Sequence, residues 1–301
     1  MIINLNEGFA PFGPGIPIKN FLFPSRCELN VRVPPEAFSD PGFDGKVLVT
    51  ARVSSSDDIM SVMFVADALD RIDEVKEKHL FLPFMPYGRQ DHIVAPGEAL
   101  SLEVVARMIV SCGWNRVTVF DPHSDVTAAL LGKEARVITN LELVRKVLEG
   151  KTGYRVASPD AGAYKKVGKL ADELGIDDVA SCGKVRDPRP ENRGKILRMT
   201  VPEADYTGLD IYLIDDIIEG GRTFIGLAQE FKKRGAAHAY LIVSHPVLSF
   251  GDAEVQKHLD GIYTTDSFAP VGTFDPNFVK VTPLSDLVVA STKGAVSCTT
   301  P

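Results

Sequence analysis

Short apolar runs rich in β-branched residues alternate with longer segments of helical periodicity, and this alternation is the strongest constraint on the fold. In the first half of the chain, the run from Lys46 to Thr50 precedes a helical segment from Asp57 to Ile72. The same order continues through His79 to Leu82, Ser101 to Cys112 and Arg116 to Phe120. Such alternation predicts an α/β domain with a parallel sheet.

The alternation starts again after Gly150 and continues to Val243, so the chain is predicted to contain two α/β halves. We place these halves at residues 1–145 and 146–301. Within the second half, the segment from Asp187 to Arg198 is dense in Pro, Arg, Asn and Gly, which favours turns over packed structure. We expect a mobile loop there.

Composition narrows the class of protein without indicating its activity. The 301 residues are 45% hydrophobic and 24% charged, which is typical of soluble globular proteins. The four cysteines lack the spacing of a zinc site, and the first residues lack the character of a leader, which predicts a cytoplasmic protein without a zinc site. The apolar stretches are only as long as strands, so no membrane span is predicted. The net charge of -7 disfavours nucleic-acid binding, so an anionic substrate must be held by local cations or metal ions.

One apolar run ends in paired carboxylates and a glycine-rich turn. Asp215 and Asp216 close the run, and Gly220 and Gly221 come shortly before the next helical pattern. Alone, an acidic pair with two glycines is more typical of a solvated strand end and an ordinary turn. In this order, however, glycine amides can close on an anion at a helix start while the acids hold ribose hydroxyls or a metal. The stretch therefore predicts a sugar-phosphate site.

This stretch resembles the phosphoribosyl-binding signature of type I phosphoribosyltransferases and PRPP synthetases, in which a hydrophobic strand leads through Asp-Asp to Asp-Thr-Gly-Gly-Thr. Other segments resemble the ribose-phosphate diphosphokinase (PRPP synthetase) family in the family's order, over roughly Phe23 to Ser244. They are Pro86-Tyr-Gly-Arg-Gln-Asp-His92, Phe120-Asp-Pro-His-Ser-Asp125, Ala157-Ser-Pro-Asp-Ala-Gly162 and Gly183-Lys-Val-Arg-Asp187. The ordered set is far more specific than any single match.

The resemblance implies an α/β fold of two type I phosphoribosyltransferase-like domains with mainly parallel sheets and an active site in the cleft between them. Residues 1–145 correspond to the N-terminal domain, and residues 146–301 to the C-terminal domain that carries the ribose-phosphate loop. Because family members are built from dimers, it also implies a homo-oligomer.

The resemblance further implies roles for single residues in catalysis and metal binding. Lys184 and Arg186 are assigned to transition-state stabilisation, because two cations one residue apart on an extended chain point to the same side. His123 and Asp160 are assigned to the Mg²⁺ that accompanies ATP.

Two further groups of residues are assigned to the substrates. A guanidinium suits phosphate oxygens and an amide suits adenine, so ATP is assigned to the residues around Arg89. The ATP group is Glu28, Arg89, Gln90, Asp91 and His92. The acceptor group is Asp215, Asp216, Glu219, Gly220, Gly221, Arg222 and Thr223.

The sequence departs from the family at three places. The phosphate loop reads Glu219-Gly-Gly-Arg-Thr223, so a hydroxyl donor is lost and Arg222 replaces a glycine. Phe23 to Glu28 lacks the central acid and glycine of the adenine-reading segment, and His92 replaces an arginine. Arg222 fits either a link to ribose 5-phosphate or a pairing with a diester or diphosphate, as in ADP-ribose.

Together these features predict an ATP-dependent pyrophosphokinase. It would transfer the β,γ-pyrophosphoryl group of MgATP to the anomeric hydroxyl of a phosphorylated ribose and release AMP. The acceptor would be ribose 5-phosphate or a ribose extended at its 5-prime position, such as ADP-ribose. The alternatives are a phosphoribosyltransferase that consumes PRPP and a non-catalytic homologue, like the PRPP synthetase-associated proteins, that keeps the fold to bind partners.

Overall fold

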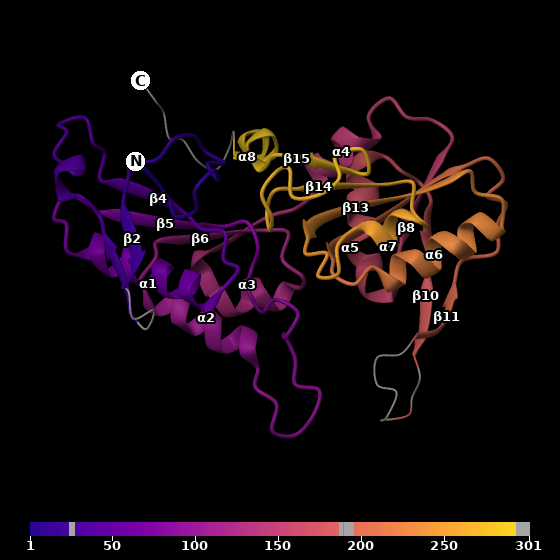
Figure 1. The fold of residues 1–301 in the computed structure, drawn as a ribbon, viewed down its shortest axis with the longest axis horizontal. Coiled ribbons are helices and arrows are strands. Elements are labelled where there is room, and N and C mark those ends of the chain that lie inside the picture. Colours follow the sequence, from indigo (N-terminus) through magenta and orange to yellow (C-terminus); the bar gives the residue numbers. More distant parts are fainter. Residues whose placement is uncertain (24–27, 187–188, 190–195, 293–301) are drawn as a thin grey trace. The chain divides into compact units, whose positions relative to one another are not determined.

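The computed structural model describes residues 1–301 except 24–27, 187–188, 190–195 and 293–301 (Figure 1). The chain divides into two compact units. The first contains Met1–Thr139 and the described residues from Pro283 onward, and the second contains Asn140–Thr282. Both units are built from helices and mainly parallel strands, so the predicted α/β class is confirmed.

The first unit contains a five-stranded sheet whose strands follow one another in chain order. All neighbouring pairs are parallel, and the order is β1 (Ile2–Asn4), β4 (Lys46–Thr50), β5 (Glu77–Leu82), β6 (Arg116–Phe120) and β7 (Ala135–Ile138). Right-handed crossovers between strands in this order place the connecting helices on one face. Figure 1 shows α1 (Ser56–Asp70), α2 (Ser101–Ser111) and α3 (Asp125–Leu131) on the same side of the sheet.

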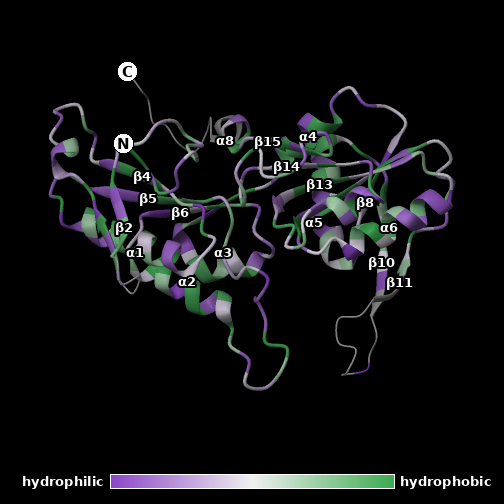
Figure 2. Ribbon diagram, viewed as in Figure 1, coloured by the Kyte–Doolittle hydropathy of each residue, from purple (hydrophilic) through white to green (hydrophobic). Residues whose placement is uncertain are grey.

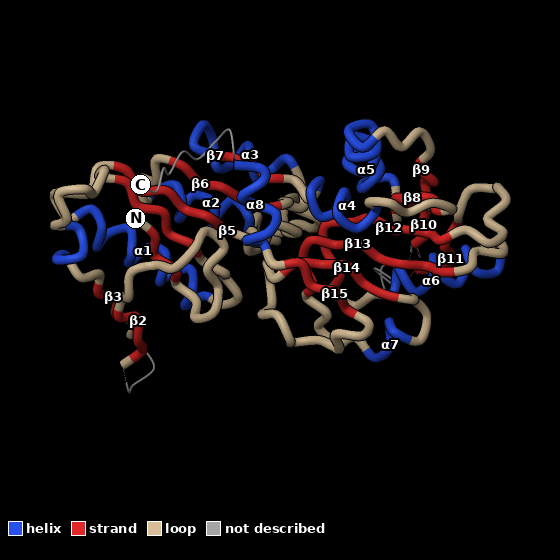
Figure 3. Tube along the Cα trace, turned by 90° about the horizontal axis from the view of Figure 1, so that it is seen from above, coloured by secondary structure: helices blue, strands red, loops and turns tan. Residues whose placement is uncertain are grey.

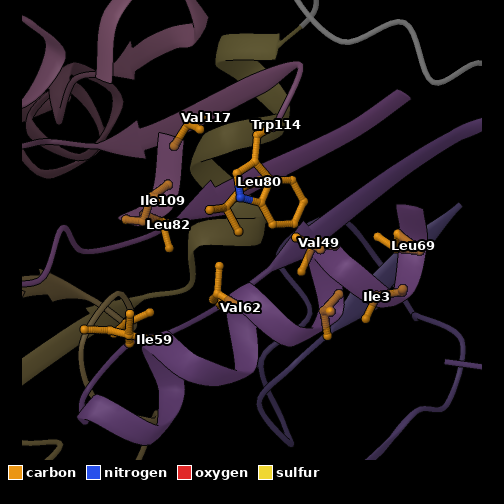
Figure 4. Packing of buried hydrophobic residues seen from close by; sticks show 14 of the residues in the cluster. Ile3, Val49, Ile59, Val62, Leu69, Leu80, Leu82, Ile109, Trp114 and Val117 are labelled. Carbon is orange, nitrogen blue, oxygen red and sulfur yellow. The ribbon is translucent and has the colours of Figure 1, made fainter. Parts of the chain in front are cut away.

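The core of the first unit lies between this sheet and those helices (Figure 4). Val49, Leu80 and Val117 from the strands and Val62 from α1 are each at most 1% exposed. Helix α1 starts with a capping box, in which Ser55 Oγ accepts from the Asp58 amide at 3.2 Å. A serine N-cap with an acid three residues later therefore starts this helix.

Several smaller elements complete the first unit. An antiparallel hairpin of β2 (Lys19–Leu22) and β3 (Leu29–Arg32) contacts α1. Short 3-10 turns occur at Pro35–Phe38 and Gly132–Glu134. Helix α8 (Leu284–Thr292) belongs to this unit although it lies at the other end of the sequence.

The second unit contains a six-stranded parallel sheet in which the strand order reverses once. The order is β15 (Val279–Thr282), β14 (Gly261–Thr265), β13 (His238–Pro246), β12 (Asp210–Ile218), β8 (Tyr154–Ser158) and β9 (Val179–Ser181). Figure 3 shows β12 to β15 side by side. The reversal lies between β8 and β12, and open α/β sheets bind ligands at such switch points beyond the carboxyl ends of the strands.

The helices of the second unit are α4 (Leu141–Leu148), α5 (Ala161–Leu174), α6 (Arg222–Lys233) and α7 (Ala253–Gln256). Green and purple bands alternate along α6 in Figure 2, as expected for a helix that buries one face. Its buried face consists of Phe224, Leu227, Ala228 and Phe231. An antiparallel arm of β10 (Gly183–Arg186) and β11 (Ile196–Thr200) extends from this unit.

The break between the units differs in position from the division that the sequence suggests after residue 145. Asn140 and α4 belong to the second unit, where Leu143 and Val144 are buried and α4 contacts β13 and β14. The separate roles expected of the two halves stay a prediction. The expected mobile loop from Asp187 lies largely outside the described residues, and its last three residues, 196–198, form the start of β11. None of the described helices combines the length and apolar character that a membrane crossing requires.

Candidate functional site

The glycine-rich turn after β12 is built as a helix start. Gly221 is the N-cap of α6 and has a φ of 70°, a conformation that side chains other than glycine rarely adopt. A Cβ at Gly221 would lie 2.7 Å from Val255 Cγ2, so both backbone and space require glycine here. The first amides of a helix lack intrahelical acceptors and stand at its positive end. The residues from Glu219 to Thr223 therefore form a loop suited to a phosphate.

The acidic pair lies within β12 rather than at its end. The sequence pattern suggests a strand that stops at the acids, whereas β12 continues to Ile218 because Ile217 and Ile218 still pair with β13. Asp215 Oδ1 accepts a hydrogen bond from the Asp216 amide at 2.9 Å, and Asp216 is only 4% exposed. Burial, followed by the charge of Asp216, raises the pKa of Asp215 well above 3.8, although Lys166 opposes the shift. This carboxyl thus holds a proton more readily than an ordinary aspartate.

Asp160 follows β8 and caps α5, where its Oδ1 accepts from the Ala163 amide at 3.0 Å. Its other oxygen makes an ion pair with Lys184 Nζ from β10. Burial raises the pKa of Asp160, but the hydrogen bonds from Lys184 and from the Ala163 amide outweigh burial and lower the pKa below 3.8. The structure therefore brings a residue predicted to bind metal against a residue predicted to be catalytic.

Arg186, the other predicted catalytic cation, occupies the last position of β10. It pairs through its backbone with Ile196 of β11, after a register shift that follows Val185. The Arg186 side chain lies outside the described residues. Its predicted role stays a prediction.

The Asp160 turn and the phosphate loop emerge at the same edge of the second sheet. Strands β8 and β12 are parallel neighbours, with Ala157 paired to Leu213. Because the switch point lies between these two strands, the turn after β8 and the loop after β12 flank the place where such sheets bind ligands. The predicted acceptor residues and the Asp160–Lys184 pair thus share one sheet edge.

The predicted ATP and metal residues of the first unit gather at the ends of β5 and β6. A Cβ at Gly88 would lie 3.8 Å from His123 Cβ, which places the two loops against each other. Burial raises the pKa of Asp91, but the hydrogen bond with His92 and the charge of His123 help to lower it below 3.8 overall. His92 Nδ1 lies 2.7 Å from Asp91 Oδ1. The segments 86–92 and 120–125 therefore form one cluster.

Arg89 and Gln90 belong to this cluster and are exposed on its surface. The Gln90 amide donates to the Tyr87 carbonyl at 2.8 Å, which closes a tight turn. Tyr87 has a φ of 60°, and Asp121 in the neighbouring loop has a φ of 44°. Left-handed backbone in non-glycine residues is uncommon and concentrates at functional sites.

Glu28, the remaining predicted ATP residue, lies apart from that cluster on the β2–β3 hairpin. It is exposed and accepts a backbone hydrogen bond from the Phe23 amide at 2.9 Å. A hollow of about 440 Å³ beside it is lined by hairpin residues and by Asp57, Met60 and Phe64 next to or within α1. None of these lining residues belongs to the segments 86–92 or 120–125.

The predicted metal ligands His123 and Asp160 lie in different units. In the part of the chain that the structure describes, no three His, Cys, Asp or Glu side chains gather closely enough to hold an ion. Nucleotide-bound Mg²⁺ keeps waters and phosphate oxygens and needs only one or two protein carboxylates. The ionised carboxylate of Asp160 fits that need without a complete protein cage.

Sequence reasoning missed one neighbour of the predicted residues. Lys166 on α5 opposes the raised pKa of Asp215. The sequence carries no signal for this role, because a lysine on a helix is usually solvated.

The architecture is similar to that of a known protein fold. No family model matches the chain. The crystal structure of phosphoribosylpyrophosphate synthetase from Mycobacterium smegmatis superposes with a TM-score of 0.74 at 23% identity, covering 91% of this chain and 88% of that one. The fold and the two loop clusters thus define a protein of the PRPP synthetase fold, and the predicted type I phosphoribosyltransferase-like fold is confirmed.

Sequence relatives identify the family. A ribose-phosphate pyrophosphokinase of Marinomonas sp. is 30% identical over 231 residues, which are 75% of this chain and 71% of the relative. A protein of the same name from Helicobacter hepaticus is 28% identical over 244 residues, covering 80% and 76%. The chain belongs to the ribose-phosphate pyrophosphokinase family, a family of pyrophosphoryl transferases, and at these identities it is a divergent member.

Proposed function

We propose that this protein is an ATP-dependent pyrophosphokinase that acts on a phosphorylated ribose. The observation that carries the proposal is the ion pair between Asp160 and Lys184 at the sheet edge that also presents the Gly220–Gly221 loop. Phosphoryl transfer rests on positioning and on stabilising charge, and a cation at the same sheet edge as a phosphate loop suits both tasks.

The reaction forms one bond to phosphorus and breaks another. The anomeric oxygen of the ribose attacks the β-phosphorus of ATP, and the bond between the β-phosphorus and the bridging oxygen to the α-phosphorus breaks. AMP leaves with the electron pair of the broken bond, and the anomeric hydroxyl loses its proton. Net negative charge builds up on the bridging oxygen of the leaving AMP.

Lys184 is suited to meet this charge. Its Nζ is held by Asp160, and its side chain is 23% exposed, so it is ordered while an anion can still approach it. The lowered pKa keeps Asp160 ionised at neutral pH, so its carboxylate stays available to pair with the ammonium group of Lys184. Mg²⁺ would neutralise the triphosphate when bound; His123 is the ligand proposed on the first unit and Asp160 the ligand proposed on the second. When MgATP enters, Lys184 can then shift from the carboxylate towards the phosphates.

The acceptor is held by the acidic pair and the loop after β12. Asp215 and Asp216 can hydrogen-bond the ribose hydroxyls, and a protonated Asp215 can donate as well as accept. The amides that start α6 would bind the 5-prime phosphate. Arg222 is exposed at the first position of α6, where its guanidinium can reach a phosphate beyond the loop. Ribose 5-phosphate and ADP-ribose both satisfy these contacts.

The nucleotide would be bound by the cluster on the first unit. Arg89 can pair with phosphate oxygens, Gln90 can read the adenine edge, and Asp91 orients His92. Glu28 lies on a separate hairpin, so its contact with ATP would come from a second subunit in a homo-oligomer built from dimers. We further propose that the protein acts in the cytoplasm.

The test is to incubate the protein with MgATP and either ribose 5-phosphate or ADP-ribose, while following AMP release and the mass of the sugar product. A gain of one pyrophosphate on the sugar, matched by AMP, supports the proposal. If no AMP is released with either acceptor, the pyrophosphokinase proposal fails. A product that forms from PRPP without ATP would instead support the phosphoribosyltransferase alternative, and binding without turnover would support the non-catalytic one.

A further inference from the structure

Phe250 is the most exposed large apolar side chain among the described residues, at 83%. It lies in the segment that joins β13 to α7, after the buried Leu248. So little of its surface is buried that the ring contributes little to folding. Single exposed apolar residues are ordinary on protein surfaces, so the location of this ring is what matters.

The ring of Phe250 lies against the phosphate loop. A Cβ built on Gly220 would be 3.7 Å from Phe250 Cε2 and 3.8 Å from Cδ2, which is van der Waals contact. Gly220 itself is exposed, so the ring and the glycine form one continuous surface. Along the chain, Gly220 is followed directly by Gly221, the N-cap of α6, and by the exposed Arg222 at the first position of the helix.

The backbone fixes this position. The amides of Val247 and Leu248 donate to the Ile218 carbonyl, at 3.0 and 3.1 Å, so the segment is tied to the last residue of β12. Leu248 has a φ of 42°, and the Gly251 amide donates to the Leu248 carbonyl at 2.7 Å. The turn that carries Phe250 is thus attached directly to the residue that precedes the phosphate loop.

We propose that Phe250 determines acceptor specificity by stacking on an aromatic ring that the acceptor carries beyond its 5-prime phosphate. This inference rests on the proposed function. Because the loop holds the first phosphate, a group attached to that phosphate must leave the loop across its exposed rim, where Gly220, Phe250 and Arg222 lie. An aromatic face there matches a nucleobase, and the adjacent guanidinium matches a second phosphate.

The chemistry separates the two candidate acceptors. Ribose 5-phosphate ends at its phosphate and offers no ring to Phe250. An acceptor of the ADP-ribose type carries a second phosphate and a base, and a base stacked on an aromatic side chain gains from several-fold to about a hundredfold in affinity. Phe250 therefore favours the extended acceptor.

The experiment measures binding and turnover separately. Calorimetry gives the affinity of the wild-type protein, Phe250→Ala and Phe250→Tyr for ADP-ribose and for ribose 5-phosphate. We expect Phe250→Ala to weaken the binding of ADP-ribose about tenfold relative to that of ribose 5-phosphate. Phe250→Tyr should restore the binding of ADP-ribose. With turnover, the change should appear in KM for ADP-ribose rather than in kcat.

The control is Val271→Ala, which removes another exposed apolar side chain from the same unit, 61% exposed. It should leave both affinities unchanged. An unaltered affinity ratio in Phe250→Ala, equal losses for both acceptors, or wild-type binding of ribose 5-phosphate alone would overturn the inference. If no AMP is released with either acceptor, the proposed function fails, but an affinity for ADP-ribose that depends on Phe250 can still be measured.

Discussion

Lys184 and Asp160 form an ion pair that joins the base of the β10–β11 arm to the first turn of α5, across 24 residues of sequence. Both side chains are about one-quarter exposed, so the pair is ordered yet accessible to an anion. The pair therefore links the stability of the second unit to the proposed chemistry, and the two contributions can be separated by mutation.

Replacing Lys184 by alanine should remove most of the activity and little of the fold. Loss of one donor aimed at developing negative charge costs about 10²–10³-fold in kcat. AMP release under saturating MgATP measures the effect, and Lys169→Ala, an exposed lysine on α5, is the matched control. Full activity in Lys184→Ala would show that this residue has no role in the mechanism.

Asp160→Asn should destabilise the protein in a pH-dependent way. The folded-state pKa of Asp160 lies below the ordinary aspartate value of 3.8. At a pH between the folded-state pKa and 3.8, the folded state therefore binds fewer protons than the unfolded state. The stabilisation is present above pH 3.8 and is lost as the pH falls through the lower value. Because asparagine still caps the helix, urea unfolding at pH 7 should show a loss of about 1 kcal/mol. A difference that stays constant down to the most acidic pH at which the protein folds would contradict this assignment.

Asp215→Asn should have the opposite effect on stability. The raised pKa means that the folded state binds more protons than the unfolded state above pH 3.8, so the carboxylate destabilises the fold as the pH rises. Removing the charge should therefore raise the urea midpoint at pH 8 and change it little near pH 4. Activity should fall in the same variant, because an acceptor contact is lost. A lower midpoint at pH 8 would show that the charge is compensated in the folded state.

Gly221→Ala and Gly220→Ala form a matched pair for the phosphate loop. Alanine at 221 must adopt a φ near 70° and place its Cβ 2.7 Å from Val255 Cγ2, so a loss of about 1–3 kcal/mol is expected. Alanine at 220 meets only Phe250, at ordinary contact distance, and should leave the melting temperature unchanged. Thermal unfolding distinguishes them, and equal losses in both variants would argue against the left-handed cap as the cause.

The sequence predicts the elements of the fold well and their partners less well. Apolar runs such as Lys46–Thr50 and Arg116–Phe120 form strands with those bounds, because buried parallel strands need continuous apolar residues. Helix α8 shows the limit of this reasoning. Its Leu284, Leu287 and Val288 are buried, and their apolar character predicts burial, but periodicity does not indicate which unit the helix joins.

The same distinction holds for the candidate site. Glycines before a helix predict the phosphate loop, because a left-handed cap such as Gly221 favours glycine and a helix start binds anions. The contact of Lys184 with Asp160 depends on where the β10–β11 arm leaves the sheet, which no local pattern encodes. Phe250 gives no signal at all in the sequence, since only its position beside Gly220 distinguishes it from other phenylalanines.

In the sequence, the first unit is formed by residues before and after the second unit: Met1–Thr139 precede it and α8 follows it. A chain that leaves the ribosome from its N-terminus therefore exposes all of Asn140–Thr282 before α8 emerges. The second unit can complete its sheet while the first still lacks a helix. The unit whose synthesis begins first is therefore finished last.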